Sequence, residues 1–221
     1  MPRCLEPKPD VLPAAQKEIW TNLAQASHLN FVLYGGTAIA LHLGHRTSLD
    51  FDFFRSDALD KDQIRAKFQF VCGSAVLQDA PETLIILAEM PAGPVRVSFF
   101  GGIRFGRVND PLETCDGTLL VASLDDLMAT KLKTMLDRAE AKDYRDVAEM
   151  ISAGVSLPAG LSAFKKMFDG EPAQVLRAIG YFDDGDLNTL STADREILSG
   201  ARDRVGKLPE VHLKPGSLTG H

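Results

Sequence analysis

The spacing of hydrophobic residues changes twice along the chain. Up to residue 68, short apolar runs alternate with stretches of helical spacing. From Ala75 to Phe100 the apolar period is two, which is typical of strands with one buried face. Beyond Ser123, apolar residues recur at helical spacing as far as residue 204. The pattern therefore predicts an α/β (α+β) fold, with a mixed sheet in the first part and helices in the second.

Individual elements follow from this pattern. Strands are predicted over residues 31–34, 49–54, 75–78, 83–89, 94–100 and 117–121. Helices are predicted over residues 14–28, 37–43, 57–68, 124–137, 142–153, 157–168, 172–179 and 193–204. Gly44 occupies the position of a helix C-cap. We expect an α/β core over 1–121, a helical region packed on it over 122–206, and a mobile tail over 207–221, which lacks periodicity.

Composition narrows the class of protein. Of 221 residues, 45% are hydrophobic and 24% charged, as in ordinary globular proteins, and the net charge of −6 gives no global signature of a nucleic-acid binder. The charged, proline-containing N-terminus and the lack of a long apolar stretch predict a cytoplasmic protein with no membrane contact. Cys4, Cys72 and Cys115 are too scattered for a zinc motif and odd in number, so we expect incidental or buried thiols.

The first candidate site joins a glycine turn to two carboxylates. Gly35, Gly36 and Thr37 follow an apolar run and open a short helix, where backbone N–H groups and the helix dipole favour a phosphate. Asp50 and Asp52 alternate with Leu49, Phe51 and Phe53, which we expect to face the core, so the two carboxylates share the other face. Such a pair suits a divalent metal carrying a nucleoside triphosphate. Taken separately, the halves also fit a tight turn and a solvated edge strand.

Charged residues elsewhere extend this site. Arg46 lies between the halves and could contact a phosphate or pair with Asp52. Lys131 falls inside an apolar helical arc, so its ammonium needs an anion or must snorkel at the rim of the core. On the next helix Asp143 lies at the edge of the inward face, whereas Asp146 is expected further round, toward solvent. Asp143 either pairs with Lys131, activates an acceptor hydroxyl, or complements the helix dipole.

Three blocks of sequence carry a family resemblance. They are Tyr34-Gly-Gly-Thr-Ala through Asp50-Phe-Asp52, Asp126-Leu-Met-Ala-Thr-Lys131, and Lys142-Asp-Tyr-Arg-Asp146. Together they resemble the AbiEii/AbiGii toxin-type nucleotidyltransferases, a branch of the polymerase-β-like nucleotidyltransferase superfamily. The resemblance implies that the glycine turn holds the triphosphate of an NTP and that Asp50 and Asp52 hold Mg²⁺ or Mn²⁺. Lys131 and an aspartate of the third block, Asp143 or Asp146, would complete the catalytic set.

The resemblance also implies partners, and one strand departs from the superfamily pattern. An RNA or protein acceptor and an antitoxin protein are expected. Superfamily enzymes usually carry a third carboxylate on a neighbouring strand, where this chain has Ser98. A hydroxyl is a poor general base or metal ligand. Three readings therefore stay open: an active nucleotidyltransferase toxin, a weak or inactive nucleotide-binding protein on the same fold, and a nucleotidyltransferase that modifies a small molecule.

Overall fold

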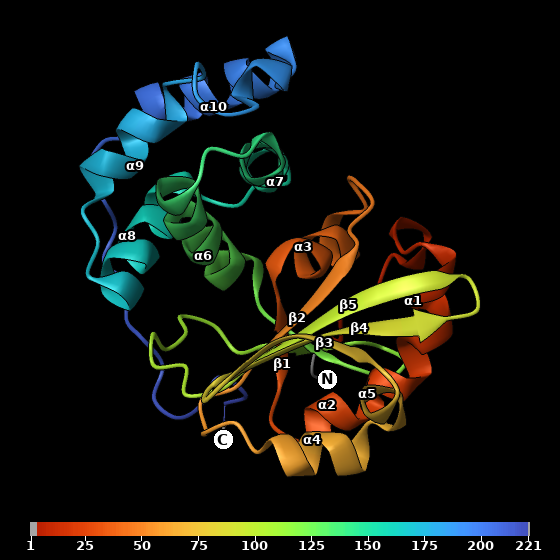
Figure 1. Ribbon diagram of the computed structural model, residues 1–221. Helices are drawn as coiled ribbons and strands as arrows, with labels where there is room; N and C mark the ends of the chain where they lie inside the picture. Colours follow the sequence, from red (N-terminus) through yellow and green to blue (C-terminus); the bar gives the residue numbers. More distant parts are fainter. Residues whose placement is uncertain (1–3, 221) are drawn as a thin grey trace. The chain divides into compact units, whose positions relative to one another are not determined.

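A computed structural model of the chain describes residues 4–220, which fall into two compact units. The first unit contains residues 4–106, 110–122 and 215–220, and the second contains residues 107–109 and 123–214. Within the described residues, all strands belong to the first unit and form one seven-stranded sheet of order β3-β4-β5-β2-β1-β7-β6. Figure 1 labels strands β1 to β5 of this sheet. The mixed α/β fold is as the sequence predicted.

The sheet is mixed in direction. Its strands are β1 (Val32–Tyr34), β2 (Asp50–Phe54), β3 (Ala75–Ala80), β4 (Thr83–Met90), β5 (Gly93–Phe100), β6 (Leu112–Glu113) and β7 (Leu120–Val121). β2 runs parallel to β5 and β1 parallel to β7, and the other neighbours are antiparallel. Each predicted strand is present with shifted ends. The two-residue strand β6 was missed because so short a run shows no period.

An aromatic layer forms the core of the first unit. Phe51, Phe53 and Phe99 point to one face of the sheet and are fully buried, with Phe31 and Phe68 packed against them. Helices α1 (Ala14–Ile19), α2 (Gln25–His28), α4 (Lys61–Lys67) and α5 (Gln69–Cys72) lie on this side (Figure 1). The prediction that Leu49 faces the core was wrong: its side chain is 65% exposed, because β2 begins only at the next residue.

The helices of the first unit differ from the predicted ranges in where they break and begin. The predicted helix over 14–28 is broken by the 3₁₀ turn η2 (Trp20–Ala24), which contains the weak helix formers Thr21 and Asn22. Helix α4 begins later than predicted, because the Asp60 side chain accepts a hydrogen bond from the Gln63 N–H at 2.9 Å and caps it there. Helix α3 (Gly35–Leu43) ends as expected at Gly44, whose φ is +72°.

The second unit is helical, as predicted. It contains α6 (Leu124–Asp137), α7 (Ala141–Ser152), α8 (Leu157–Phe168), α9 (Pro172–Ile179), η3 (Leu187–Thr189) and α10 (Thr192–Asp203). Serine side chains cap three of these helices: Ser123 for α6, Ser156 for α8 and Ser191 for α10. These capping residues explain why the predicted helix starts agree with the structure to within one residue.

Buried Asp126 ties residues 107–109 to this unit. Its carboxylate accepts hydrogen bonds from the N–H of Val108 at 2.6 Å, the N–H of Asn109 at 3.2 Å and the Ser123 hydroxyl at 2.5 Å. Burial raises the pKa of Asp126 above its usual value, although these donors act in the opposite direction. Asp126 is therefore a structural residue that joins a distant loop to the start of α6.

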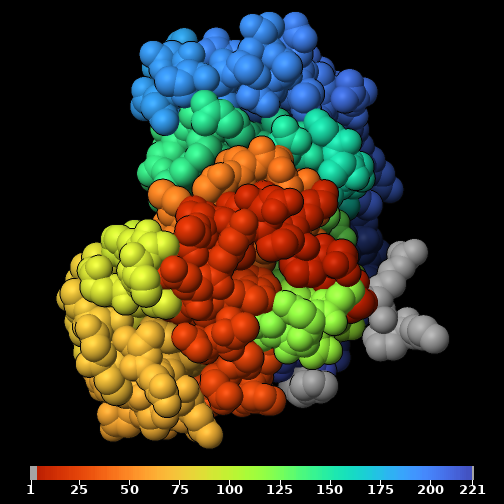
Figure 2. Space-filling view, turned by 90° about the vertical axis from the view of Figure 1, so that its right-hand side faces the viewer, coloured from red at the N-terminus to blue at the C-terminus, as the bar shows by residue number. Residues whose placement is uncertain are grey.

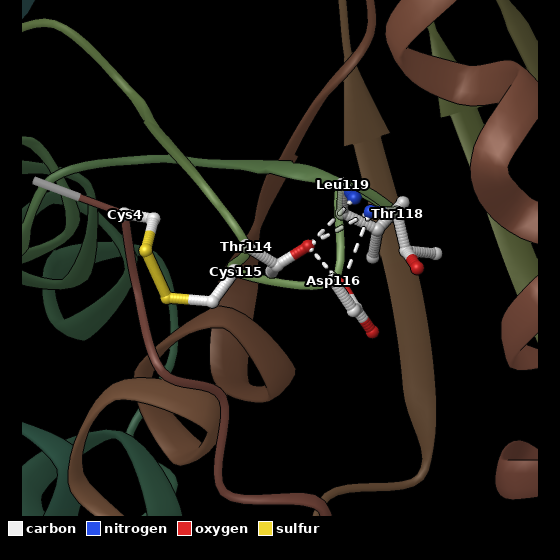
Figure 3. Close-up of a disulfide and its surroundings, with 6 residues drawn as sticks. All are labelled: Cys4, Thr114, Cys115, Asp116, Thr118 and Leu119. Carbon is white, nitrogen blue, oxygen red and sulfur yellow. Dashed lines mark hydrogen bonds between the residues drawn. A yellow bond between two sulfur atoms is a disulfide. The ribbon is translucent and has the colours of Figure 1, made fainter. Parts of the chain in front are cut away.

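The cysteines correct a sequence expectation. Cys4 and Cys115 form a disulfide, whereas Cys72 is an exposed free thiol, so the expectation of incidental or buried thiols was wrong (Figure 3). The N-terminal segment brings the two cysteines together, since Leu5 exchanges backbone hydrogen bonds with Glu113 and Cys115, each at 2.8 Å. Figure 2 shows this segment, in red, against the light-green residues around position 115. A contact across 111 positions is invisible to local sequence patterns.

The carboxy-terminal tail has no helix or strand among its described residues, 207–220. Leu218 is nevertheless buried, and its N–H donates a hydrogen bond to the Ser56 hydroxyl at 3.0 Å. His221, part of the tail predicted to be mobile, lies outside the described residues. Across residues 4–220, no helix combines the length and the apolar character needed to cross a membrane.

Candidate nucleotide site

The start of helix α3 is shaped by the absence of side chains at two glycines. Gly35 has a φ of +75°, and a Cβ built on it would lie 2.6 Å from the Asp52 Oδ2 atom. The Asp52 carboxylate therefore lies directly against the first residue of the helix. The N-cap residue, Tyr34, makes no side-chain capping hydrogen bond to this turn. Backbone N–H groups and a carboxylate thus meet at the positive end of a helix dipole.

The Thr37 side chain has a structural role. Its hydroxyl hydrogen-bonds the Ser48 hydroxyl at 2.9 Å and donates to the Asp50 carbonyl oxygen, and the residue is 1% exposed. These bonds fasten the first turn of α3 to the beginning of β2. Any contact of Thr37 with a phosphate would use its backbone N–H, because the hydroxyl is already engaged.

Arg46 lies over the second glycine. A Cβ built on Gly36 would approach the Arg46 Nη2 atom to 2.6 Å, and Arg46 Nη1 donates to the Thr47 carbonyl at 3.0 Å. The structure therefore brings Gly35, Gly36, Arg46 and Asp52 together around one helix start. A guanidinium beside the first backbone N–H groups of a helix is suited to a phosphate oxygen.

Asp50 and Asp52 share one face of β2, as predicted, and both are half-buried. Their neighbours on the parallel strand β5 are Arg96 and Ser98, respectively. Within residues 4–220 there is no group of three or more His, Cys, Asp or Glu side chains that could hold a metal ion. The two carboxylates supply hard oxygen ligands of the kind that Mg²⁺ accepts, but only two of them.

A second cluster of charges lies within the helical unit. The Lys131 ammonium, on α6, is 2.6 Å from Asp143 Oδ1 and 2.8 Å from Asp146 Oδ2, both on α7. Lys131 is 6% exposed, and both aspartates are fully buried. Lys131 is therefore a buried, paired lysine and does not snorkel to the surface. The expectation that Asp146 points toward solvent was wrong, because Lys131 draws it into the interior.

Arg138 is a member of this cluster that the sequence prediction missed. Its Nε atom donates to Asp143 Oδ2 at 2.9 Å, and its side chain is 45% exposed. Asp143 thus accepts hydrogen bonds from two cations, one buried and one at the surface. The signal in the sequence is weak, since Arg138 follows the end of α6 and belongs to no periodic pattern.

Comparisons with known proteins agree with this architecture. A sequence model of the family described as nucleotidyl transferase AbiEii toxin, type IV TA system, matches residues 20–204. An uncharacterised protein of Aquifex aeolicus (strain VF5) is 31% identical over 120 residues, which cover 53% of this chain and 56% of that protein. The chain therefore spans only about half the length of this curated relative.

A solved structure shows the same fold. MenT4, a nucleotidyltransferase toxin from Mycobacterium tuberculosis H37Rv, superimposes with a TM-score of 0.58 over 87% of this chain and 84% of MenT4. The sequence identity is 14%, so this likeness concerns the fold alone.

Proposed function

The chain belongs to the AbiEii nucleotidyltransferase toxin family, and from this premise we propose that it transfers a nucleoside monophosphate from an NTP to an acceptor hydroxyl. The observation that carries the proposal is the contact between Gly35 and Asp52, which places a carboxylate beside the backbone of a helix start. A triphosphate with its divalent cation needs both kinds of group at one place.

Each residue of this first group has a proposed role. Asp50 and Asp52 would hold Mg²⁺ or Mn²⁺, which when bound offsets the negative charge of the triphosphate. The backbone N–H groups of Gly35, Gly36 and Thr37 would bind phosphate oxygens at the end of the helix dipole. Arg46 would add a charge-assisted hydrogen bond to the same phosphates. The acceptor hydroxyl would attack the α-phosphorus and displace pyrophosphate, with its proton passing to solvent water.

The Lys131 cluster supports a narrower role for Asp143 than the sequence left open. Lys131 and Arg138 both donate to Asp143, so its oxygens are committed to cations. We therefore propose that Asp143 and Asp146 orient the Lys131 ammonium. Activation of the acceptor hydroxyl by Asp143 is less compatible with these contacts.

The biological setting is proposed from the family alone. An antitoxin protein would be the partner, and RNA or a protein would supply the acceptor hydroxyl. No feature of the described residues selects between the two kinds of acceptor.

The test is a transfer assay with each α-labelled NTP, Mg²⁺, and total cellular RNA or protein. We expect label in the acceptor with the wild-type protein and at least a hundredfold less with the double variant Asp50→Asn/Asp52→Asn, because the cation loses both charged ligands. Asp62→Asn is the matched control: this carboxylate is 99% exposed and pairs with the nearby Arg65 at 3.4 Å, so the variant should keep wild-type activity.

Two results would contradict the proposal. Equal transfer by the wild-type protein and the double variant would show that the aspartates are not needed. Tight, metal-dependent NTP binding with no transfer to RNA, protein or small molecules would instead identify a binding protein, the reading that Ser98 in place of a carboxylate favours.

A further inference from the structure

Ser98 is a buried hydroxyl with no hydrogen-bond partner among residues 4–220. The residue lies in the middle of β5 and is 0% exposed, and its Oγ atom contacts neither a donor nor an acceptor. Most buried serine hydroxyls are hydrogen-bonded, because an unsatisfied one loses its interactions with water and gains nothing in return. An alanine at this position would fit the same strand without the free-energy cost of an unsatisfied buried hydroxyl. The protein by itself leaves the hydrogen-bonding capacity of the Ser98 hydroxyl unused.

The strand register shows where this hydroxyl points. Ser98 is paired with Asp52 on β2 and with Ile85 on β4. Paired residues on adjacent strands place their side chains on the same face of a sheet. Ser98 therefore lies on the face that carries Asp50 and Asp52, opposite the aromatic core. The Ser98 hydroxyl is thus enclosed on the face of the sheet where the half-buried Asp50 and Asp52 lie.

We propose that the Ser98 hydroxyl accepts a hydrogen bond from a water molecule bound to the divalent cation that Asp50 and Asp52 hold. This inference rests on the proposed function, since it presupposes that cation. Ser98 would then be a positioning residue, which would hold one water molecule of the bound cation.

The chemistry of the cation favours a hydroxyl in this place. Mg²⁺ gives up its water reluctantly and usually keeps several molecules when it binds to one or two carboxylates. Each retained water needs an acceptor for its protons. A neutral acceptor also adds no further negative charge to a face where two aspartates already lie side by side. Arg96, which is exposed and lies opposite Asp50 in the register of β2 and β5, is on that face as well.

The test measures cation binding and stability on the same variants. Mn²⁺ alone serves as the probe, and electron paramagnetic resonance reports free and bound metal without any turnover. We expect Ser98→Ala to bind Mn²⁺ about tenfold more weakly, the size of effect seen when outer partners of a metal site are removed. Its midpoint of thermal unfolding should equal or exceed that of the wild type, because an unsatisfied buried hydroxyl has been removed.

Two controls separate this role from a structural one. Ser162→Ala removes a buried hydroxyl that does have a partner, the Pro209 carbonyl at 2.6 Å. That variant should lower the unfolding midpoint and leave Mn²⁺ binding unchanged. Ser98→Ala, by contrast, is expected to weaken Mn²⁺ binding without lowering the midpoint. Ser98→Thr keeps the hydroxyl and should restore Mn²⁺ binding to within about threefold of wild type.

The outcomes distinguish this inference from the proposed function. If wild-type protein binds Mn²⁺ and Asp50→Asn abolishes binding, the cation site exists; unchanged affinity in Ser98→Ala then overturns the role of Ser98 alone. A lower unfolding midpoint together with unchanged Mn²⁺ affinity would assign Ser98 a purely structural role. Absence of Mn²⁺ binding by the wild type would overturn both proposals.

Discussion

At the scale of single residues, the buried charge cluster around Lys131 links a pattern in the sequence to the stability of the folded protein. A lysine inside an apolar arc signals an anion partner, because an unpaired buried ammonium is costly. In the structure Lys131 contacts two carboxylates, Asp143 and Asp146, where the pattern required one. Arg138 adds a second positive charge beside Asp143. Lys131 contacts both buried aspartates, so its removal leaves two buried carboxylates with only the partly exposed Arg138 beside Asp143.

This balance predicts the effect of single substitutions on stability. Lys131→Met should lower the free energy of unfolding by about 3–5 kcal/mol, because Asp143 and Asp146 would repel each other without it. Urea-induced unfolding provides the measurement. Lys133→Met is the control: Lys133 is 40% exposed and pairs with Asp137, so the change should stay within about 1 kcal/mol. A loss no larger than that of the control would contradict the assigned importance of the buried pairs.

At the scale of elements, helix α3 carries the glycine turn at one end and is anchored at the other. The His42 Nε2 atom lies 2.9 Å from the Ala122 carbonyl oxygen, to which it donates in the neutral tautomer that protonates Nε2. Burial lowers the pKa of His42 below its ordinary value, and the backbone hydrogen bond only partly opposes this. The folded protein thus holds His42 neutral at a pH where the unfolded chain would protonate it.

The consequence is a stability that depends on pH with a defined sign. As pH falls below about 6.5, the ordinary imidazole value, the unfolded state binds a proton that the folded state excludes. Stability is therefore fully present above that pH and declines below it, by at most about 1.4 kcal/mol per pH unit for this group. His42→Gln should flatten this part of the profile in urea titrations between about pH 7 and 5.

The comparison needs a second histidine. His212→Gln changes an imidazole whose side chain is 80% exposed and should leave the slope as in the wild type. If both variants keep the wild-type slope, the acid sensitivity comes from groups other than His42.

At the scale of the whole molecule, the disulfide joins the N-terminal segment to the β6–β7 hairpin of the first unit. Asp116 adds to this junction: it accepts hydrogen bonds from the Thr114 hydroxyl at 2.6 Å and the Trp20 indole N–H at 2.8 Å. These hydrogen bonds, with one from the Thr118 N–H, outweigh the burial that by itself would raise the pKa of Asp116, so the pKa lies below its usual value.

The disulfide should raise the free energy of unfolding of the oxidised protein, because it closes a long loop in the unfolded chain. Cross-linking positions 111 residues apart restricts the unfolded chain, for which the chain-entropy model gives about 4–5 kcal/mol. We expect Cys115→Ser to lose much of this under oxidising conditions and to match the wild type in excess dithiol, as measured by urea unfolding with thiol alkylation. Equal stability of oxidised wild type and variant would show that the bond contributes nothing.

The sequence by itself determined the elements and the candidate residues. Periods of two and of 3.6 residues place a strand or helix wherever one face must be buried, and serine caps fix the helix starts. Gly35, Gly36, Asp50, Asp52 and Lys131 were recognisable because their chemistry is unusual at those positions. All of these signals are local, so they survive in a single sequence.

Only the tertiary structure decided which partners those residues meet. The contact of Gly35 with Asp52, the inward turn of Asp146 toward Lys131 and the bond between Cys4 and Cys115 each join separate elements or distant parts of the chain. The isolation of the Ser98 hydroxyl likewise depends on every strand and helix around it. Such contacts follow from how the whole chain packs, and packing is a collective property that no local period encodes.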